Sequence, residues 1–446
     1  MTTLTKVLTL VLFSLFFSFY AHGQKEGSAK TLINNVQIFD GHELITSNGA
    51  VRIEGNKIIE VSTQPVESRA GETVIDGEGK FLMPGLIDAH VHLAWNLGPA
   101  QSFFAPSDYI AALTLVEAKA TLMRGYTSIR DVAGQSQGVK MAIDEGRFDG
   151  PRIWYAGAAI GMTAGHADMR NTYARPRQMG GESWSDVERT GISVFADGVP
   201  EVLIAARMQM RQGAHLLKMF TSGAVSGVYD PLDIAEYSFD EIKAAADEAK
   251  RWNTYLAVHT YNDKGTQLAL EAGAMSIEHA ALISEETVKM MAEKGAFLSA
   301  QTGIYMADAP ADWSADQKAK QQQAREGLDN LFELAKKYKL KIALGTDLVG
   351  DMEIKKQQAF ELTNRLRWFS PAEILTQATI NNAELLSWSG PRNPYPGKLG
   401  TIEEDAFADL LLVNGNPLED LKLFNEPEKN LLVIMKDGKI YKNILD

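Results

Sequence analysis

We interpret one segment as decisive for the fold of this chain, namely Phe81-Leu-Met-Pro-Gly-Leu-Ile-Asp-Ala-His-Val-His92. It is an apolar stretch that ends in two histidines one residue apart. Residues i and i+2 of a β-strand face the same side, so His90 and His92 point their imidazoles at one place. Imidazole is a common ligand of zinc and related metals. The segment therefore predicts a strand that carries part of a metal site.

Outward from this segment, apolar strands alternate with helix-like stretches as far as residue 390. Capping-box sequences at Ser238-Phe-Asp-Glu241 and Ser370-Pro-Ala-Glu373 mark the starts of two helices. Eight β/α units predict an α/β fold with a (β/α)8, TIM-like barrel over residues 81–390. The predicted strands are Leu82–Asp88, Tyr126–Arg130, Arg152–Ala156, Leu216–Met219, Tyr255–His259, Met275–Glu278, Ala296–Ser299 and Lys341–Gly345.

Both flanks of the predicted barrel are rich in short strands. Residues 24–80 include Ala50-Val-Arg-Ile-Glu-Gly-Asn56, and residues 391–446 include Leu432-Val-Ile-Met-Lys-Asp-Gly438 with an Asp-Gly turn signal. Two β-rich ends around a different middle predict a small β-sandwich domain built from both termini.

The first 23 residues have the pattern of a secretory signal peptide. Lys6 precedes the apolar run Val7–Tyr20, and small residues surround a cleavage point after Gly23. The run is short for a bilayer span, so we expect cleavage, a secreted or periplasmic location and no membrane association afterwards. The sequence has no cysteine and a net charge of −13, which excludes disulfides and makes nucleic acid a poor partner.

Four histidines lie where predicted strands end. His90 and His92 close the first barrel strand, while His259 and His279 close two later ones. Side chains at the carboxyl ends of barrel strands converge above one mouth. A lone histidine in a strand is more often a packed residue with a hydrogen-bond partner, but four together are hard to explain by packing. They also exceed what one catalytic metal with an open position takes, so we expect two metals.

Asp347 and Lys218 are the other candidates for this site. Asp347 follows the last predicted strand, where a carboxylate can bind a metal and accept a proton; its alternative role is a helix N-cap. Lys218 lies inside the fourth predicted strand, where a free ammonium is costly unless it is paired. Carbamylation would make it an anion able to bridge two metals, and an ion pair with a neighbouring acid is an equally open alternative.

These motifs resemble the amidohydrolase superfamily, in the branch of imidazolonepropionase-like proteins and Xaa-Pro, prolidase-like dipeptidases. The matching stretches are Met83-Pro-Gly-Leu-Ile-Asp-Ala-His-Val-His92, Leu217-Lys-Met-Phe-Thr-Ser-Gly223, Ile277-Glu-His279 and Leu344-Gly-Thr-Asp347. The resemblance implies one divalent metal on His90, His92 and Asp347, a second on His259 and His279, and a carbamylated Lys218 between them. One departure is Ala224, where the family pattern often has a second glycine.

The implied chemistry is hydrolysis of amide C–N bonds by a metal-bridging hydroxide, with Asp347 as general base and acid. Zinc is the expected metal, although such ligands also accept manganese, cobalt or iron. By the same resemblance, His166 and Tyr261 contact the substrate carbonyl or the tetrahedral intermediate; a backbone-bonded histidine and a packed tyrosine are the alternatives. Three loop residues are candidates to meet a substrate carboxylate, namely Arg170, Arg175 and Arg177.

The leading hypothesis is a secreted dipeptidase or carboxypeptidase of Xaa-Pro type, or an N-acyl amino acid hydrolase, acting on small-molecule or dipeptide substrates. A cyclic amide hydrolase resembling imidazolonepropionase and a catalytically silent metal-binding barrel are the alternatives. Long loops at 166–200 and 221–237 should lie on the catalytic face as lids or specificity elements. No motif specifies an oligomeric state, so a homo-oligomer stays open.

Overall fold

The structure is a computed structural model that describes residues 29–445, without the side chains of residues 99, 100 and 103. The predicted signal peptide, residues 1–23, lies outside this range. Within residues 29–445, we find no helix that combines the length and the apolar character needed to cross a membrane.

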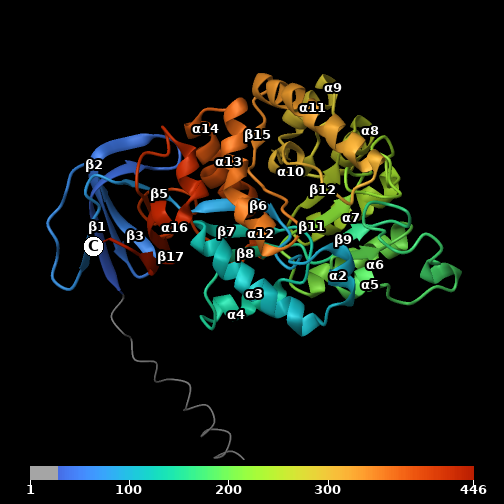
Figure 1. The fold of residues 1–446 in the computed structure, drawn as a ribbon, viewed down its shortest axis with the longest axis horizontal. Coiled ribbons are helices and arrows are strands. Elements are labelled where there is room, and N and C mark those ends of the chain that lie inside the picture. The colour runs from blue at the N-terminus through green and yellow to red at the C-terminus, as the bar shows by residue number, and fades with distance from the viewer. Residues whose placement is uncertain (1–28, 446) are drawn as a thin grey trace, which may run out of the picture.

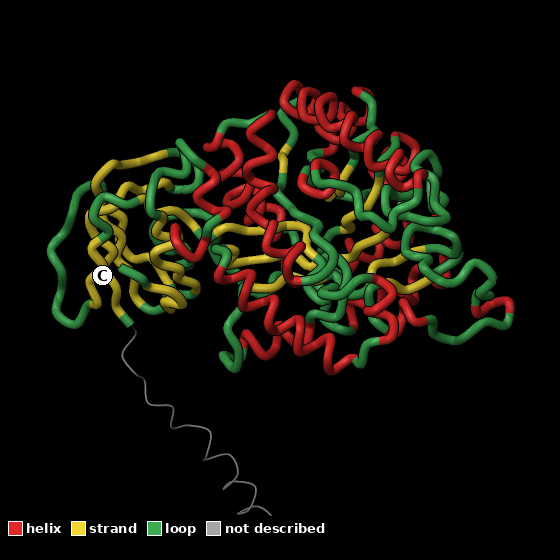
Figure 2. The backbone as a smooth tube through the Cα atoms, viewed as in Figure 1, coloured by secondary structure: helices red, strands yellow, loops and turns green. Residues whose placement is uncertain are grey.

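Eight parallel strands form the centre of the molecule (Figures 1 and 2). They lie in two sheets, which backbone hydrogen bonds of 2.9 Å join at both ends, from His215 N to Tyr155 O and from Ala89 N to Leu344 O. The strands thus follow one another around a closed ring. They are β6 (Leu86–Val91), β7 (Tyr126–Asp131), β8 (Arg152–Tyr155), β11 (Leu217–Phe220), β12 (Leu256–Thr260), β13 (Ser276–His279), β14 (Phe297–Ser299) and β15 (Lys341–Ile342).

Seven of these strands match the predicted ones to within three residues, and the first differs for a local reason. The predicted strand Leu82–Asp88 is split at Gly85 into β5 (Phe81–Pro84) and β6. A Cβ at Gly85 would lie 2.2 Å from Oγ1 of Thr127, so only glycine allows this close approach. The chain crosses here from the terminal sheet into the ring.

Helices connect the strands and cover the outside of the ring (Figure 2). Capping boxes begin α7 and α14, as predicted from Ser238 with Glu241 and Ser370 with Glu373. The longer helices are α3 (Ser107–Met123), α4 (Gln137–Asp144), α6 (Val199–Arg211), α7 (Phe239–Arg251), α8 (Asp263–Ala272), α9 (Glu285–Lys294) and α11 (Ala315–Lys337). The short ones are α2 (Pro99–Phe104), α5 (Asp186–Arg189), α10 (Gly303–Met306), α12 (Met352–Lys355), α13 (Phe360–Asn364), α14 (Pro371–Thr376), α15 (Asn382–Ser387) and α16 (Pro427–Asn430).

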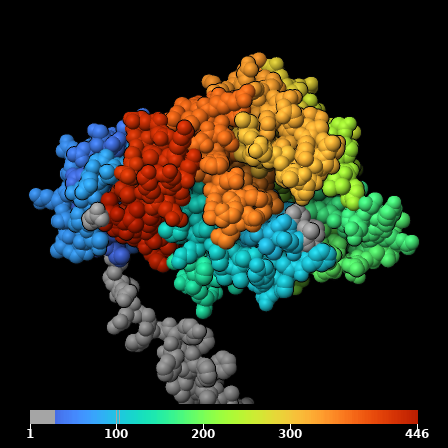
Figure 3. Space-filling view, viewed as in Figure 1, coloured from blue at the N-terminus to red at the C-terminus, as the bar shows by residue number. Residues whose placement is uncertain are grey.

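The two ends of the described chain form one mixed eight-stranded sheet. Its strand β5 pairs parallel with β1 and antiparallel with β16, so it joins the two ends, which pack against each other in Figure 3. A cluster of buried apolar side chains, including Ile33, Leu82 and Leu412, forms the core of this sheet. Besides β5, its strands are β1 (Lys30–Phe39), β2 (Leu44–Glu54), β3 (Lys57–Ser62), β4 (Thr73–Asp76), β16 (Leu410–Val413), β17 (Leu431–Lys436) and β18 (Lys439–Asn443).

The long loop predicted at 166–200 contains regular structure, so that prediction is wrong in part. Its strand β10 (Ser193–Phe195) pairs with β9 (Ala159–Gly161), which in turn pairs with β11. Helix α5 begins at a capping box of Ser185 and Glu188 and lies beside α2 (Figure 1). Short strands and a one-turn helix of this kind carry too little periodicity to be recognised from sequence.

Candidate metal centre

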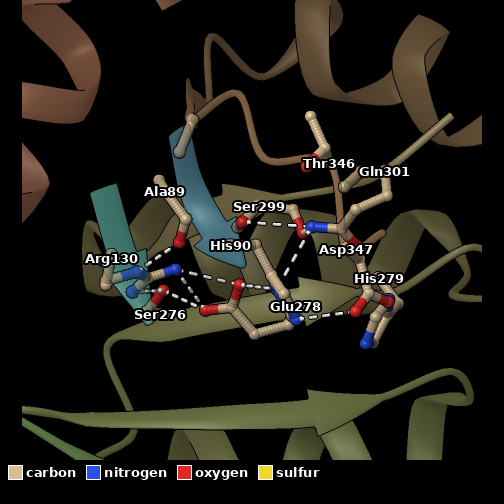
Figure 4. A network of polar contacts seen from close by, with 12 residues as sticks. Ala89, His90, Arg130, Ser276, Glu278, His279, Ser299, Gln301, Thr346 and Asp347 are labelled. Carbon is tan, nitrogen blue, oxygen red and sulfur yellow. Dashed lines mark hydrogen bonds and ion pairs between the residues drawn. The ribbon is translucent and has the colours of Figure 1, made fainter. Parts of the chain in front are cut away.

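Four of the predicted metal ligands meet at the mouth of the ring. The Nε2 atoms of His92 and His90 lie 3.0 and 3.4 Å from Oδ1 of Asp347, and Nδ1 of His279 lies 3.9 Å from its Oδ2. The ligand atoms of His90, His279 and Asp347 all lie within 4.8 Å of one another (Figure 4). Because the strands are parallel, their carboxyl ends bring these distant residues to one place.

The two histidines of the first strand are oriented by their other ring nitrogen. Nδ1 of His90 donates to Oε2 of Glu278 at 2.8 Å, and Nδ1 of His92 donates to the carbonyl oxygen of Ala133 at 3.1 Å. A hydrogen bond on Nδ1 fixes the tautomer and leaves Nε2 as a lone-pair donor. Burial lowers the pKa of His90 to about 4, which keeps this imidazole neutral, as metal ligation requires.

Glu278 is a functional residue that the sequence analysis missed. Arg130 donates to both of its carboxylate oxygens, at 2.8 and 2.9 Å, and both side chains are fully buried (Figure 4). Burial opposes the ionisation of Glu278, but the Arg130 guanidinium holds the pKa of Glu278 well below its usual range. The charged carboxylate can therefore orient His90.

Asp88 joins the first strand to the segment that carries Asp347. Its Oδ1 accepts hydrogen bonds of 3.1 Å from the backbone N–H groups of His90 and Thr346, and its Oδ2 accepts one of 2.7 Å from the Thr346 hydroxyl. Burial raises the pKa of Asp88 to about 6. Asp88 thus links His90 to Thr346, the residue directly before Asp347, and so holds the His90 and Asp347 segments together.

Left-handed backbone conformations occur at the site itself. His279, Ala280 and Asp347 have φ angles of 69°, 58° and 54°. Non-glycine residues adopt this region rarely, and such strain concentrates at functional sites. In a regular strand Glu278 and His279 would face opposite sides. The turn at His279 breaks this alternation, so both side chains reach the site (Figure 4).

His259 lies beside His279 but is less constrained by the protein. Their ring centroids are 4.3 Å apart, and Nε2 of His259 is buried without a hydrogen-bond partner among residues 29–445. Burial also keeps the pKa of His259 well below 6.5, so the ring is neutral. A neutral imidazole with an unsatisfied buried nitrogen fits a metal ligand, because buried polar atoms normally have a partner.

Lys218 is buried, at 2% exposure, and lies within the electrostatic reach of Glu278 and Asp347. Burial lowers its pKa to about 8. Within the described part of the chain its ammonium forms no hydrogen bond and no ion pair within 4.0 Å, so the simple ion pair considered above is not found. A lysine with a lowered pKa is the type that can react as a free amine, which fits carbamylation.

The two residues carried over as substrate contacts stack on these histidines. His166 lies over His259 with ring centroids 4.7 Å apart, and Tyr261 lies parallel to His279 at 5.2 Å. The hydroxyl groups of Tyr261 and Tyr305 form a hydrogen bond with each other, and the Tyr305 hydroxyl oxygen lies 3.2 Å from Nδ1 of His279. Tyr305, from α10, was not identified in the sequence, because nothing in a four-residue helix marks it.

Two of the three candidate arginines are already paired. Arg170 donates to both oxygens of Asp168, at 2.7 and 2.6 Å, and Arg177 donates to Glu188 at 2.9 Å. Arg175 is exposed and has no polar partner within residues 29–445.

The comparison with known proteins identifies the family. Residues 81–441 match the amidohydrolase family. The chain belongs to this family. It is therefore a hydrolase that acts on amide bonds, and its family is typically metal-dependent.

Relatives of this amidohydrolase include enzymes of the predicted branch. Ochratoxinase from Aspergillus niger is 32% identical over 382 residues, which cover 81% of this chain and 75% of the relative. A crystal structure of a prolidase complexed with N-methylphosphonate-L-proline has a TM-score of 0.85 and 31% identity, and covers 93% of this chain and 100% of its own. A Xaa-Pro dipeptidase with bound methionine in its active site has a TM-score of 0.81, 28% identity and coverage of 93% and 100%.

Proposed function

We propose that this amidohydrolase is a binuclear dipeptidase or carboxypeptidase of Xaa-Pro type, or an N-acyl amino acid hydrolase. The convergence of His90, His92, His279 and Asp347 at one mouth carries the proposal. The likeness to a prolidase complexed with a proline phosphonate supports the Xaa-Pro preference, and the likeness to ochratoxinase supports amide hydrolysis more broadly.

The donor set fits two divalent cations, for which we propose zinc. His90, His92 and Asp347 would hold one, His259 and His279 the other, and Lys218, carboxylated on Nζ, would contribute to both. The bound cations would supply a Lewis acid for the substrate carbonyl and lower the pKa of water. The neutral imidazoles and the unpartnered Nε2 of His259 support this assignment.

The remaining steps belong to the side chains of the chain itself. Asp347 accepts a proton from the attacking water as its oxygen bonds the carbonyl carbon, and returns a proton to the nitrogen as the C–N bond breaks. His166 and Tyr261, stacked over two of the histidines, orient the substrate carbonyl group. Arg175 is our candidate for the substrate carboxylate.

We also propose a secreted or periplasmic location, on the basis of the signal-peptide pattern. In the proposed domain division, residues 81–390 form the barrel, and residues 24–80 and 391–446 form the sandwich. The sheet that unites both chain ends supports a domain built from both termini, and its strand β5 (Phe81–Pro84) moves the start of the barrel from residue 81 to Gly85.

The proposal is tested by one assay on one sample. The purified protein is incubated with Xaa-Pro dipeptides, other dipeptides and N-acyl amino acids, and its metal content is measured in the same preparation. We expect hydrolysis of at least one class and about two metals per chain. Bound metal without turnover on any amide would overturn the proposal in favour of a binding protein.

A further inference from the structure

His166 is held from two sides by acids of the segment 221–237, which we call the acidic segment. Oδ2 of Asp230 lies 3.3 Å from Nδ1 of the His166 ring. Oε1 of Glu236 accepts a hydrogen bond of 2.6 Å from the His166 backbone N–H. Both acids are buried, at 1% and 2% exposure. One side chain thus contacts the ring and the other contacts the backbone of the same residue.

Asp230 is itself fixed in place. The backbone N–H of Ala224 donates to its Oδ2 at 2.8 Å, and the Lys320 ammonium donates to the Asp230 and Gly227 carbonyl oxygens at 3.2 and 3.1 Å. The backbone at Gly227 packs so closely that a Cβ there would lie 1.8 Å from Oδ1 of Asp230. The carboxylate is therefore in position independently of the ring that it contacts.

Glu236 supports the backbone under the ring. A Cβ at Gly165 would lie 2.5 Å from Oε2 of Glu236, so the turn before His166 rests directly on this carboxyl group. Oε2 is buried and has no hydrogen-bond partner among the described residues. Burial raises the pKa of Glu236 to about 9, so the group is a neutral acid near pH 7. Glu236 is therefore placed to support the loop that carries His166 and not to contact the substrate.

These contacts decide which atom of His166 is available. The ring is stacked over His259, and its Nδ1 faces Oδ2 of Asp230 at 3.3 Å, which is an ion-pair distance without hydrogen-bond geometry. Nε2 forms no hydrogen bond within residues 29–445. A carboxylate beside one ring nitrogen keeps a proton there and fixes the ring orientation, which leaves the other nitrogen for a ligand.

We propose that Asp230 and Glu236 are positioning residues that hold His166 with Nε2 toward the substrate carbonyl group. This inference rests on the proposed function. In it, the acidic segment holds His166, the first residue of the 166–200 segment, in place beside His259. Misplacement of an orienting group by about 1 Å is enough to cost about 100-fold in rate.

Kinetics of four variants test the proposal on a substrate that the wild type hydrolyses. Asp230→Ala should lower kcat about 10- to 100-fold, with little change in KM, metal content or unfolding temperature. Asp230→Asn should lose less, because an amide oxygen can still accept from Ala224. Glu236→Gln, an isostere of the neutral acid, should lose the least. Asp197→Ala is the matched control, because Asp197 anchors the same turn through Thr163 without contacting His166.

A double-mutant cycle separates positioning from a general structural role. In the His166→Asn background, Asp230→Ala should lower kcat less than about twofold further, because the side chain it positions is gone. An effect as large as in the wild type would show that Asp230 acts independently of His166 and would overturn the proposal. If Asp230→Ala does not fold, Asp230→Asn takes its place in the cycle.

An NMR measurement keeps this proposal separate from the proposed function. In the ¹⁵N-histidine-labelled protein, the His166 signals are assigned as those lost in His166→Asn. Asp230→Ala should change the Nδ1 signal of His166, and Asp197→Ala should not. Failure of the wild type to hydrolyse any amide sinks the proposed function alone, whereas an unchanged Nδ1 signal in Asp230→Ala sinks the positioning proposal whatever the activity.

Discussion

The two sides of the candidate metal centre differ in how far the protein itself satisfies their polar atoms. On the side of β6, His90 and His92 each have Nδ1 bonded, to Glu278 and to a carbonyl oxygen. On the side of β11 and β12, Nε2 of His259 is buried without a hydrogen-bond partner within residues 29–445, and the buried Lys218 ammonium forms no ion pair within 4.0 Å there. The first side is preorganised by the fold, and the second depends on what binds there.

This difference has an energetic meaning. A buried polar group without a partner costs about 1–3 kcal/mol, and a buried charge costs more. The unpartnered Lys218 and His259 therefore lower the stability of the metal-free protein, while the bonded His90 and His92 do not. Metal binding should recover that cost, so the two sides should respond in opposite directions to substitution. The following predictions address this contrast, from the largest expected effect to the smallest.

Replacement of Asp347 should have the largest effect on activity. Asp347→Asn removes the proton acceptor of the preorganised side, and we expect kcat to fall about 10⁴-fold. Steady-state kinetics on the substrate found in the panel measure this. The control is Asp351→Asn, a nearby exposed helix cap, which should leave kcat unchanged. A comparable loss in both variants would remove the special role of Asp347.

Removal of Arg130 should destabilise the preorganised side. Arg130→Met leaves the Glu278 carboxylate buried without its cationic partner, which should lower the free energy of unfolding by about 3–5 kcal/mol. Urea unfolding of the metal-free protein measures the loss. Adding Glu278→Gln should recover much of it, because the uncompensated charge is then gone. Wild-type stability in the single variant would contradict the assigned ion pair.

Removal of Lys218 should have the opposite sign in the metal-free protein. Lys218→Met deletes an unpaired buried ammonium and should raise the free energy of unfolding by about 1–3 kcal/mol. The same variant should bind fewer than two metals per chain, measured by elemental analysis. Two metals in the variant would count against a bridging role for Lys218.

The smallest effect is expected at Glu236 and depends on pH. Its pKa is 4.5 when exposed and is raised to about 9 by burial, so unfolding between these values releases a proton. This contribution to stability is full below about pH 4.5 and is lost as pH rises toward 9. Glu236→Gln should therefore gain about 1–2 kcal/mol relative to the wild type at pH 9 and nothing at pH 5. Glu271→Gln, at an exposed site on α8, should show no such difference.

The sequence predicted the ring strands and the group of metal-site candidates because both depend on local patterns. Strand period and His-x-His spacing act over a few residues, and parallel strands then bring their ends together. Glu278 escaped notice because regular alternation would turn it away from His279. The left-handed backbone conformation of His279 brings both side chains to the same site, and no residue type at this position predicts that conformation.

The supporting residues from loops were out of reach for another reason. Asp230, Glu236 and Tyr305 contact His166 or His279 only through the folded arrangement of distant segments. Loop acids and tyrosines are common on surfaces, so their type alone does not separate a supporting residue from a solvated one. The split at Gly85 was hidden likewise, because β5 and β6 form one continuous apolar run.

The pairing of β5 with β16 also determines when the molecule can be completed during its synthesis. β5 leads directly into the strand that carries His90, but its neighbour on one edge is supplied by Leu410–Val413, near the end of the chain. Until the ribosome has released that stretch, β5 presents an apolar strand with one edge unpaired, a template for aggregation. Nascent chains stalled before Leu410 should therefore need a chaperone to stay in solution.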